Sequence, residues 1–219
     1  MAKQKSMKTL RFYLSVFLLA LSVIANAQYI SSKSNAFLGG GTESIDGVRP
    51  GLRFSCKIIT MDWSGENKEM YGFSADYVHP ISLSANVPLF LETGIGYQYS
   101  TYDAEIDISM HSLNVPLNLG YVISVSEKFS MTPYIGLNLR SNLSADASYE
   151  TYYGGKKELD LFDDEDMETP WNKFQIGLQF GFGLNLNWFY LGLGYGIDLN
   201  ELGEELKLKS LTSTIGFNF

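Results

Sequence analysis

Large apolar side chains alternate with small or polar ones along most of the sequence, and this period of two residues constrains the fold more than any other feature. In the clearest stretch, residues 173–186 (KFQIGLQFGFGLNL), Phe, Ile and Leu occupy the even positions, while Lys, Gln, Gly and Asn occupy the odd ones. Successive side chains of a β-strand point to opposite faces, whereas an amphipathic helix repeats every 3.6 residues. The pattern therefore predicts an all-β protein.

The same alternation recurs in seven further stretches, which brings the number of predicted strands to eight. The further stretches are residues 51–58, 71–77, 89–100, 113–121, 134–140, 189–199 and 211–219. Three connections are compact (79–88, 124–129 and 185–187), and four are longer or more polar (62–69, 103–107, 142–170 and 200–205). An even number of strands, with short turns at one end and longer loops at the other, is typical of outer-membrane barrels. We therefore predict an eight-stranded antiparallel transmembrane β-barrel with both termini in the periplasm and four loops outside.

The chemistry of the two faces distinguishes a membrane barrel from a soluble one such as a lipocalin, which also alternates. A soluble barrel carries its charges outside and its apolar side chains inside. In residues 89–99 and 173–199, one face instead consists of Phe, Leu, Ile and Tyr, and almost every charge lies on the opposite, glycine-rich face. Small residues fit the narrow lumen of an eight-stranded barrel. We therefore expect the large apolar face to contact lipid, where closure is required because unpaired backbone groups are costly in hydrocarbon.

The first 27 residues have the three parts of a secretory signal peptide. A basic start (residues 3–11) precedes a short apolar core (12–24), and residues 25–27, Ala-Asn-Ala, form a small-x-small cleavage site. The core is too short for a spanning helix, which disfavours the alternative of a retained membrane anchor. Gln28 follows the predicted cleavage site where a lipoprotein would have cysteine. We predict a cleaved signal peptide at residues 1–27 and one barrel domain at residues 28–219.

Charge and cysteine content exclude several classes of function. Four of the 16 basic residues and none of the 24 acidic residues lie in residues 1–27, so the exported part carries 12 bases and 24 acids. A chain this acidic repels nucleic acid, which we exclude as a partner. Cys56 is the single cysteine, so there is no internal disulfide, and we expect this residue to be a small apolar side chain on a strand. The sequence has no nucleotide or metal-binding motif, and we predict no cofactor and no metal site.

Charged residues on the glycine-rich face are the candidate functional residues of the lumen. They are Arg53, Lys57, Asp76, Glu92, Arg140, Lys173 and Asp198. Isolated buried charges are costly, so we expect these residues to pair. One interpretation is a narrow, selective path for small solutes. The other, favoured because side chains usually fill barrels of this size, is a plugged and salt-bridged interior.

An acidic segment lies in the longest predicted loop. Residues 158–168 (ELDLFDDEDME) hold seven acids and no base. Asp163, Asp164, Glu165 and Asp166 could offer oxygen ligands to Ca²⁺, but the segment lacks the spacing of a Ca²⁺-binding loop. We expect a solvated surface loop, which together with the tyrosines at 149, 152 and 153 could bind a protein partner.

Histidine is scarce, which limits the possibilities for catalysis. His79 precedes Pro80 in a predicted periplasmic turn, and His111 is next to Ser112. Adjacent strand residues point to opposite faces, so His111 and Ser112 cannot easily form the nucleophile–base pair that a lipid A-modifying enzyme would need. We predict that the chain is not an enzyme. A structural, adhesive or partner-binding role through the outer loops is favoured, with a narrow porin for small solutes as the alternative.

Four segments carry a family resemblance. They are SLNVPLNLGY (112–121), TPYIGLNLR (132–140), FQIGLQFGFGLNL (174–186) and YLGLGYGIDLN (190–200). Together with the signal ending ANAQ, they resemble outer-membrane β-barrel proteins of the Bacteroidetes that are described as porin-like or PorT-like. The resemblance implies insertion among the lipids of the outer membrane of a Gram-negative bacterium. It implies no particular activity, because the family is functionally mixed.

The last strand ends in two alternating aromatic residues, Phe217 and Phe219. They resemble the C-terminal signal that the barrel-assembly machinery recognises during biogenesis. The usual pattern has glycine where this chain has Thr214, so the match is partial. A lipid-facing last strand requires the same alternation, and the two interpretations are compatible.

Overall fold

The computed structural model describes residues 48–63, 66–84, 87–104, 106–126, 128–150, 155–163, 169–204 and 206–219. The predicted signal peptide at residues 1–27 lies outside the described residues and stays a prediction. In the described part of the chain, no helix is long and apolar enough to cross a membrane.

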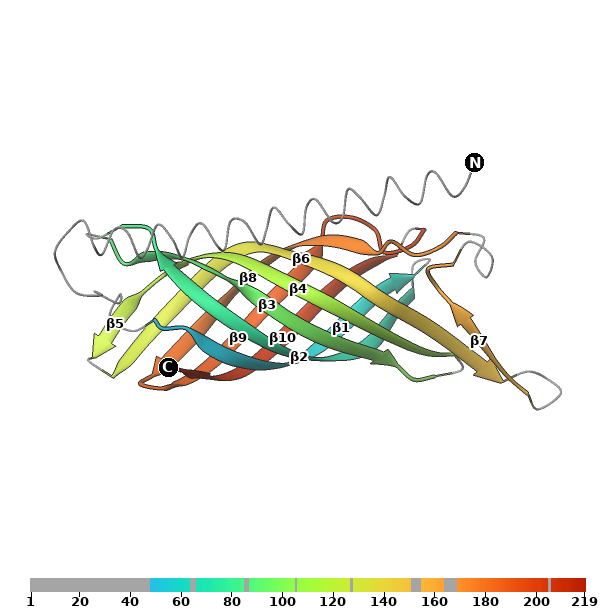
Figure 1. Cartoon of the computed structure of the whole chain (residues 1–219), viewed down its shortest axis with the longest axis horizontal. Coiled ribbons are helices and arrows are strands. Elements are labelled where there is room, and N and C mark those ends of the chain that lie inside the picture. The colour runs from blue at the N-terminus through green and yellow to red at the C-terminus, as the bar shows by residue number, and fades with distance from the viewer. Residues whose placement is uncertain are drawn as a thin grey trace. The chain divides into compact units, whose positions relative to one another are not determined.

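Eight long antiparallel strands close into a barrel (Figure 1). They are β1 (Gly51–Trp63), β2 (Glu66–Ser82), β3 (Leu89–Tyr102), β4 (Asp107–Tyr121), β6 (Phe129–Glu150), β8 (Phe174–Leu186), β9 (Phe189–Asp198) and β10 (Lys207–Asn218). The pairing of β1 with β10 and of β4 with β6 closes the ring. Two short strands, β5 (Ile123–Ser126) and β7 (Lys156–Asp160), add to β6. The predicted eight-stranded barrel is confirmed.

The connections from β2 to β3, from β4 to β6 and from β8 to β9 lie at one end of the barrel. Asn187 and Trp188 alone connect β8 to β9, and Asn187 has a φ of 57°, a left-handed conformation that asparagine tolerates. The turn predicted to begin at His79 begins later, because β2 pairs with β3 as far as Ser82. Outer-membrane barrels have short turns on the periplasmic side and longer loops outside. We call this end, which the prediction assigns to the periplasm, the turn end, and we call the opposite end the loop end.

At the loop end, the strands are longer than the sequence pattern predicts. Residues 142–170 are expected to form a loop, but β6 continues to Glu150 and the chain returns as β7, so that both project at the right of Figure 1. The backbone of β6 keeps its partners there, since Asp107 pairs with Ser148 and Lys156 pairs with Glu150. The apolar alternation ends before the strand pairing does, which is why the sequence pattern gives a loop that is too long.

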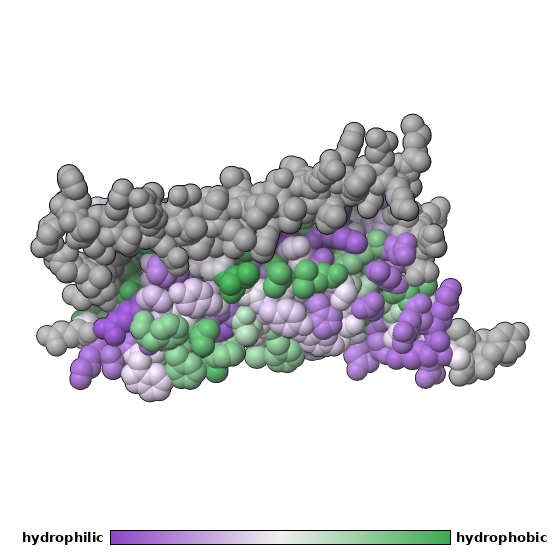
Figure 2. Space-filling model, in the orientation of Figure 1, coloured by the Kyte–Doolittle hydropathy of each residue, from purple (hydrophilic) through white to green (hydrophobic). Residues whose placement is uncertain are grey.

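The two faces of the wall have the chemistry that the alternation predicts. Along β1, Leu52 and Phe54 are exposed on the outside, whereas Arg53 is buried in the lumen. Exposed apolar side chains recur around the ring, and Figure 2 shows hydrophobic residues over the strands. Glycines on the inner face make room for the polar side chains, since a Cβ at Gly96 would overlap the carboxylate of Asp76. The outer surface is therefore suited to lipid and the lumen to polar groups.

Near the loop end, this alternation inverts. The lumen-facing positions become apolar, as Ile59 and Met61 on β1, Met110 on β4 and Leu208 on β10 are all buried. The outward positions become polar, as with Thr60 between Ile59 and Met61. An apolar inside and a polar outside are the pattern of a protein wall in water. The inversion therefore marks the level at which the barrel leaves the lipid.

In β6, a β-bulge produces the same inversion. The register with β4 shifts next to His111, where Leu143 is left without a partner. Beyond this point Ala145 and Ala147 are buried, and Asp146 is exposed. A shift of one residue moves every later side chain to the opposite face. The bulge thus places alanine, rather than aspartate, inside the loop end of the lumen.

Candidate functional site

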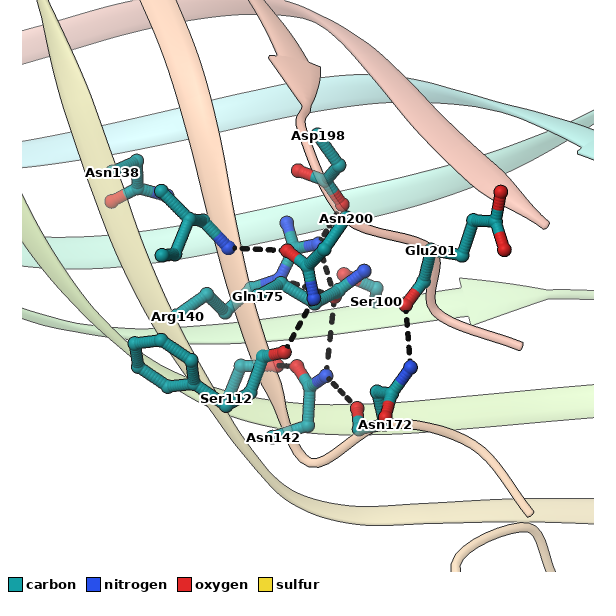
Figure 3. Close-up of polar contacts among 12 residues, drawn as sticks. Ser100, Ser112, Asn138, Arg140, Asn142, Asn172, Gln175, Asp198, Asn200 and Glu201 are labelled. Carbon is teal, nitrogen blue, oxygen red and sulfur yellow. Dashed lines mark hydrogen bonds and ion pairs between the residues drawn. The ribbon is translucent and has the colours of Figure 1, made fainter. Parts of the chain in front are cut away.

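The lumen contains a buried ion pair between two of the predicted site residues. Arg140 of β6 and Asp198 of β9 lie against each other (Figure 3). Arg140 also donates from Nε to Gln175 Oε1 at 3.0 Å. The pair thus has the additional hydrogen bonds that a buried ion pair needs to offset its loss of water. Among the predicted lumen charges, it is the one ion pair in the described part of the chain.

An amide network extends from this ion pair towards the loop end (Figure 3). Asn142 Nδ2 donates to Gln175 Oε1 and to the backbone O of Asn172, both at 3.1 Å. Ser112 Oγ donates to Asn142 Oδ1 at 2.8 Å, and Asn172 Nδ2 donates to the backbone O of Glu201 at 2.8 Å. The network therefore joins the lumen faces of β4, β6 and β8 to the connections that follow β7 and β9.

Two further cations line a polar cavity of about 120 Å³ in the middle of the lumen. Lys57 Nζ donates to Gln98 Oε1 at 2.5 Å. Arg53 Nη2 donates to Asn218 Oδ1 at 2.7 Å, and its guanidinium carbon lies 3.9 Å from the centre of the Tyr190 ring. Neutral oxygen atoms and an aromatic ring, rather than carboxylates, are thus the closest partners of these two cations.

Two acids line the same cavity. Asp76 Oδ2 accepts a hydrogen bond from Ser74 Oγ at 2.7 Å, and Glu92 Oε1 accepts one from Asn118 Nδ2 at 3.3 Å. Together with the ion pair, three bases and three acids line the cavity, so their charges balance in number. A cavity of this size has room for several water molecules, at roughly 30 Å³ each. Of the six charged residues that line the cavity, two therefore form an ion pair as expected. The other four, Arg53, Lys57, Asp76 and Glu92, have neutral hydrogen-bond partners.

Lys173 lies outside this set, contrary to the prediction. It continues the inward alternation of β8, but that strand begins one residue later, at Phe174. Lys173 is exposed, and its Nζ lies 5.4 Å from the centre of the Phe162 ring. Its backbone O accepts a hydrogen bond from Asn142 N at 2.7 Å. Periodicity predicts the face of a residue but not where the wall ends, and Lys173 lies at that end.

A cluster of buried apolar residues fills the loop end of the lumen, and we call this cluster the cap. Its strand residues are Ile59, Met61, Met70, Ile108, Met110, Ala145, Ala147 and Leu208. Its remaining residues come from the connections between strands and are Leu161, Phe162, Trp171, Leu202 and Leu206. The cap was not predicted from the sequence. The inversion of the alternation in β1, β2, β4 and β10 is the signal that could have found it.

Backbone hydrogen bonds hold the connecting segments in the mouth of the barrel. Leu161 N donates to Ala145 O at 2.9 Å, and Trp171 N donates to Leu161 O at 2.8 Å. In the connection after β9, Leu202 N donates to Leu206 O at 2.8 Å. The two connections meet at Gly203, where a Cβ would lie 2.9 Å from Trp171 Cδ1. Glycine is thus needed at this position so that the indole ring can approach closely.

A smaller apolar cluster lies at the turn end. It consists of Val48, Phe90 and Val122. The ring of Phe90 covers Gly120, where a Cβ would lie within 3 Å of the ring carbons. The polar cavity thus lies between two apolar layers of the lumen.

The structure places His111 and Ser112 on opposite faces of the wall, as the alternation predicts. Ser112 is buried in the lumen, whereas His111 lies on the outer face. There a hydrogen bond joins His111 Nδ1 to Tyr97 Oη, and the imidazole ring lies 5.0 Å from the ring of Tyr99. His111 and Ser112 therefore cannot act together as base and nucleophile.

The described residues contain no group of three or more His, Cys, Asp or Glu side chains that could hold a metal ion. Of the acidic segment 158–168, residues 164–168 lie outside the described part, so the Ca²⁺ hypothesis is not tested there. Residues 156–160 of this region form β7 rather than a loop.

The two aromatic residues of the predicted assembly signal lie at the turn end. Phe217 stacks on Trp188, with ring centres 5.6 Å apart and planes at 8°. Phe217 and Phe219 are both exposed. Their position suits an aromatic girdle at the membrane interface. Their recognition by the assembly machinery stays a prediction.

Comparisons with known proteins place the barrel among outer-membrane proteins. The sequence model of a family described as "Outer membrane protein beta-barrel domain" matches residues 15–202. No curated protein matches the sequence. Among solved structures, the chain is similar to Ail, the attachment invasion locus protein of Yersinia pestis, with 14% identity and a TM-score of 0.47 over 78% of this chain and 98% of Ail.

Two further solved structures are similar to this chain. Neisserial surface protein A (NspA) has 14% identity and a TM-score of 0.45, over 78% of this chain and 97% of that protein. The outer membrane enzyme PagL has 11% identity and a TM-score of 0.48, over 76% of this chain and 99% of that protein.

Proposed function

Since the chain belongs to the outer membrane protein beta-barrel domain family and lies in the outer membrane of a Gram-negative bacterium, we propose that its barrel is sealed and that it functions by binding a partner at the loop end. The observation that carries this proposal is the cap. Passage of a polar solute needs a continuous polar path, whereas thirteen buried apolar residues interrupt the lumen at its outer end. The alternative of a narrow porin is therefore disfavoured.

Planar-bilayer recordings of the full chain, purified in detergent, test the sealed lumen. A shift of gel mobility on heating first establishes that the sample is folded. We expect a folded barrel that gives no stable conductance steps. Stable steps whose size changes in Glu92→Gln or Arg53→Met would overturn the proposal, because both side chains line the central cavity.

The loop end is proposed as the functional surface because it is the part of the wall that extends furthest from the lipid. Here β6 and β7 form a hairpin in which Ser148 pairs with Glu158. Replacing residues 149–157 by Asn-Gly would shorten this hairpin to a two-residue turn without touching the cap. Cells that express the full chain should aggregate with one another or attach to protein-coated plates more than cells that express the shortened chain.

The control for this experiment is surface display, measured with an antibody against an added epitope. Equal display with reduced attachment supports the proposal. Equal attachment of both cell types would assign the function to another part of the chain.

We further propose that the chain is one of the Bacteroidetes-type barrels that it resembles and that Phe217 and Phe219 guide its assembly. Both residues lie exposed at the C-terminal end of the last strand, as an accessible signal requires. In Phe219→Ala, the folded fraction in the outer membrane should fall, while refolding in detergent should not change. A matched loss in Ile215→Ala, which is also exposed on β10, would instead indicate a general effect of the apolar face.

A further inference from the structure

The hairpin of β6 and β7 leads directly into the cap. β6 pairs with β8 as far as Ser141 and with β7 from Asp146 onward, so a stretch of chain that leaves the sheet separates the two partners of β6. β7 ends at Asp160, and the next two residues, Leu161 and Phe162, are buried in the cap. The element proposed for partner binding and the residues that close the mouth of the barrel are therefore contiguous in the chain.

A turn at Asp160 directs the chain from the hairpin into the mouth. Asp160 Oδ1 accepts a hydrogen bond from Phe162 N at 2.9 Å, and Asp160 O accepts one from Asp163 N at 3.2 Å. A side-chain oxygen that accepts from the backbone N–H two residues later forms an Asx turn. Asp160 is thus a positioning residue for Phe162, whose ring is part of the cap.

The second half of the same connection rests on the first. Leu161 N donates to Ala145 O of β6 at 2.9 Å, and Trp171 N donates to Leu161 O at 2.8 Å. Asn172 N donates to Leu202 O at 2.5 Å, which attaches the connection after β9 as well. Leu161 is therefore the residue through which a movement of β7 reaches the rest of the cap.

The layer beneath the cap is polar. Asn142 Nδ2 donates to Asn172 O at 3.1 Å, and the network continues from Asn142 to the Arg140–Asp198 ion pair (Figure 3). Polar groups of this kind exchange protein partners for water at a small net cost, so this layer gives little resistance when the connection moves away. The apolar contacts of the cap and the turn that leads into it therefore hold the mouth closed.

The hairpin is held in place by few strand pairs. In the part of the chain that the structure describes, β7 pairs with β6 alone, over the five residues Lys156–Asp160. An isolated two-stranded ribbon is only marginally stable in water. A partner that binds β7 can therefore displace this strand, and its displacement pulls Leu161 away from Ala145.

We propose that the hairpin and the cap move together about the turn at Asp160, and that the cap is a lid over the polar cavity. Displacement of β7 withdraws Leu161 and Phe162 from the mouth, Trp171 follows, and water reaches the cavity from the loop end. The inference rests on the proposed function and adds how partner binding there is transmitted to the lumen. The apolar cluster at the turn end stays in place, so an open lid exposes the cavity without creating a pore.

The test measures how fast a cysteine in the polar cavity reacts with a small, negatively charged methanethiosulfonate reagent, added to the full chain in detergent. The cysteine is introduced by Ser55→Cys, at a buried position that lines the cavity. The substitution Cys56→Ser removes the exposed native thiol. A group that reacts only in the open state is labelled at a rate proportional to the open population.

The first matched pair of variants acts at the turn. Asp160→Ala removes the acceptor of the Phe162 N–H, whereas Asp160→Asn keeps a side-chain oxygen and removes only the charge. We expect the labelling rate to rise about five- to tenfold in Asp160→Ala, the effect of one lost hydrogen bond, and less than about twofold in Asp160→Asn. No rise in Asp160→Ala, or an equal rise in both variants, would overturn the proposal.

The second matched pair tests whether the hairpin moves the lid from a distance. Because Leu161 N donates to Ala145 O, the alternation of the ladder directs the N–H of Lys157 towards β6 and that of Glu158 to the outer edge of β7. Lys157→Pro therefore breaks a ladder bond, while Glu158→Pro breaks none. We expect the labelling rate to rise about fivefold or more in Lys157→Pro and less than about twofold in Glu158→Pro. Equal rates in the two variants would overturn the coupling of hairpin and lid.

Phe90→Ala controls for entry of the reagent from the opposite end, because Phe90 belongs to the turn-end cluster. We expect it to leave the labelling rate unchanged. A rise in Phe90→Ala without a rise in Asp160→Ala would place the entrance at the turn end and overturn the lid. The urea midpoint of each variant should match that of the unmodified barrel. A midpoint that falls as the labelling rate rises would show that the whole barrel opens, which would also overturn the lid.

The outcome is separable from that of the proposed function. If shortening the hairpin abolishes attachment of cells but Asp160→Ala and Lys157→Pro leave the labelling rate unchanged, the loop-end function stands and the lid is wrong. If the labelling rates change as expected but cells with the shortened hairpin attach normally, the lid stands and the hairpin is not the partner-binding element.

Discussion

The middle of the lumen and its loop end are filled by opposite kinds of side chain, although the same strands line both. On β1, Arg53 and Lys57 face the polar cavity, and Ile59 and Met61 face the cap. In the middle, lipid surrounds the wall, so the polar groups must satisfy one another inside. At the loop end, water surrounds the wall, so the apolar groups can be buried inside as in a soluble protein. The medium outside the wall therefore decides what the lumen can hold.

The two regions should also respond differently to substitution. The charged residues around the polar cavity depend on matched partners, so removing one residue of a pair leaves the other buried without its partner. The cap depends on buried apolar area and on segments that fold in from the connections, so its loss should stay local.

The largest effect is expected for Asp198→Ala, which leaves Arg140 buried without a counter-charge. The free energy of unfolding should fall by about 3–5 kcal/mol. Urea unfolding in detergent, followed by the heat-dependent gel mobility, measures this change. Replacing both partners, with Arg140→Met and Asp198→Leu, should recover most of the stability. A loss in the double variant as large as in the single one would contradict the pairing argument.

A smaller and more local effect is expected for Leu202→Ala in the cap, since this side chain is fully buried. The cap should lose about 2–3 kcal/mol, which corresponds to a roughly 30- to 150-fold larger open population. Protease cleavage in residues 169–204 should rise accordingly, while the urea midpoint of the barrel stays close to that of the unmodified chain. If the urea midpoint of the barrel instead fell by as much as the loss of stability in the cap implies, the cap and the barrel would unfold together as one unit.

Gly203→Ala should act on the same cap through a single contact. The new methyl group would meet the indole of Trp171, at a cost of about 1–2 kcal/mol. The same substitution in a Trp171→Ala background should cost almost nothing further, since the clash is then absent. Protease cleavage measures both. Additive losses would mean that Gly203 matters for another reason, such as backbone conformation.

The smallest effect is expected for Lys173→Ala. This side chain is exposed and contacts Phe162 through a cation–π interaction, so its removal should cost at most about 0.5–1 kcal/mol. Urea unfolding is the measurement, and Asp198→Ala serves as the comparison. A loss of stability as large as that of Asp198→Ala would show that Lys173 belongs with the buried charges of the polar cavity. It would contradict the exposed position of Lys173 at the end of the wall.

Most of the barrel could be predicted from the sequence, because lipid outside and polar groups inside impose a two-residue period on every strand. The faces of β1 and the inward positions of Arg53, Lys57, Arg140 and Asp198 follow from that period alone. Lys173 was misplaced because alternation continues past the last residue that pairs. Which charges touch could not be predicted, since Arg140 and Asp198 are 58 residues apart in sequence.

The sequence alone thus specifies an all-β chain, the strands that form the ring and the face on which each central residue lies, because these depend on local period and on the surrounding lipid. The tertiary structure decided where the wall ends, how the bulge at Leu143 turns Ala145 inward, and that Trp171 and Leu202 fold into the mouth. It also decided that Asp146 of β6 pairs with Asp160 of β7. These features depend on register and on contacts between distant segments, which no local period encodes.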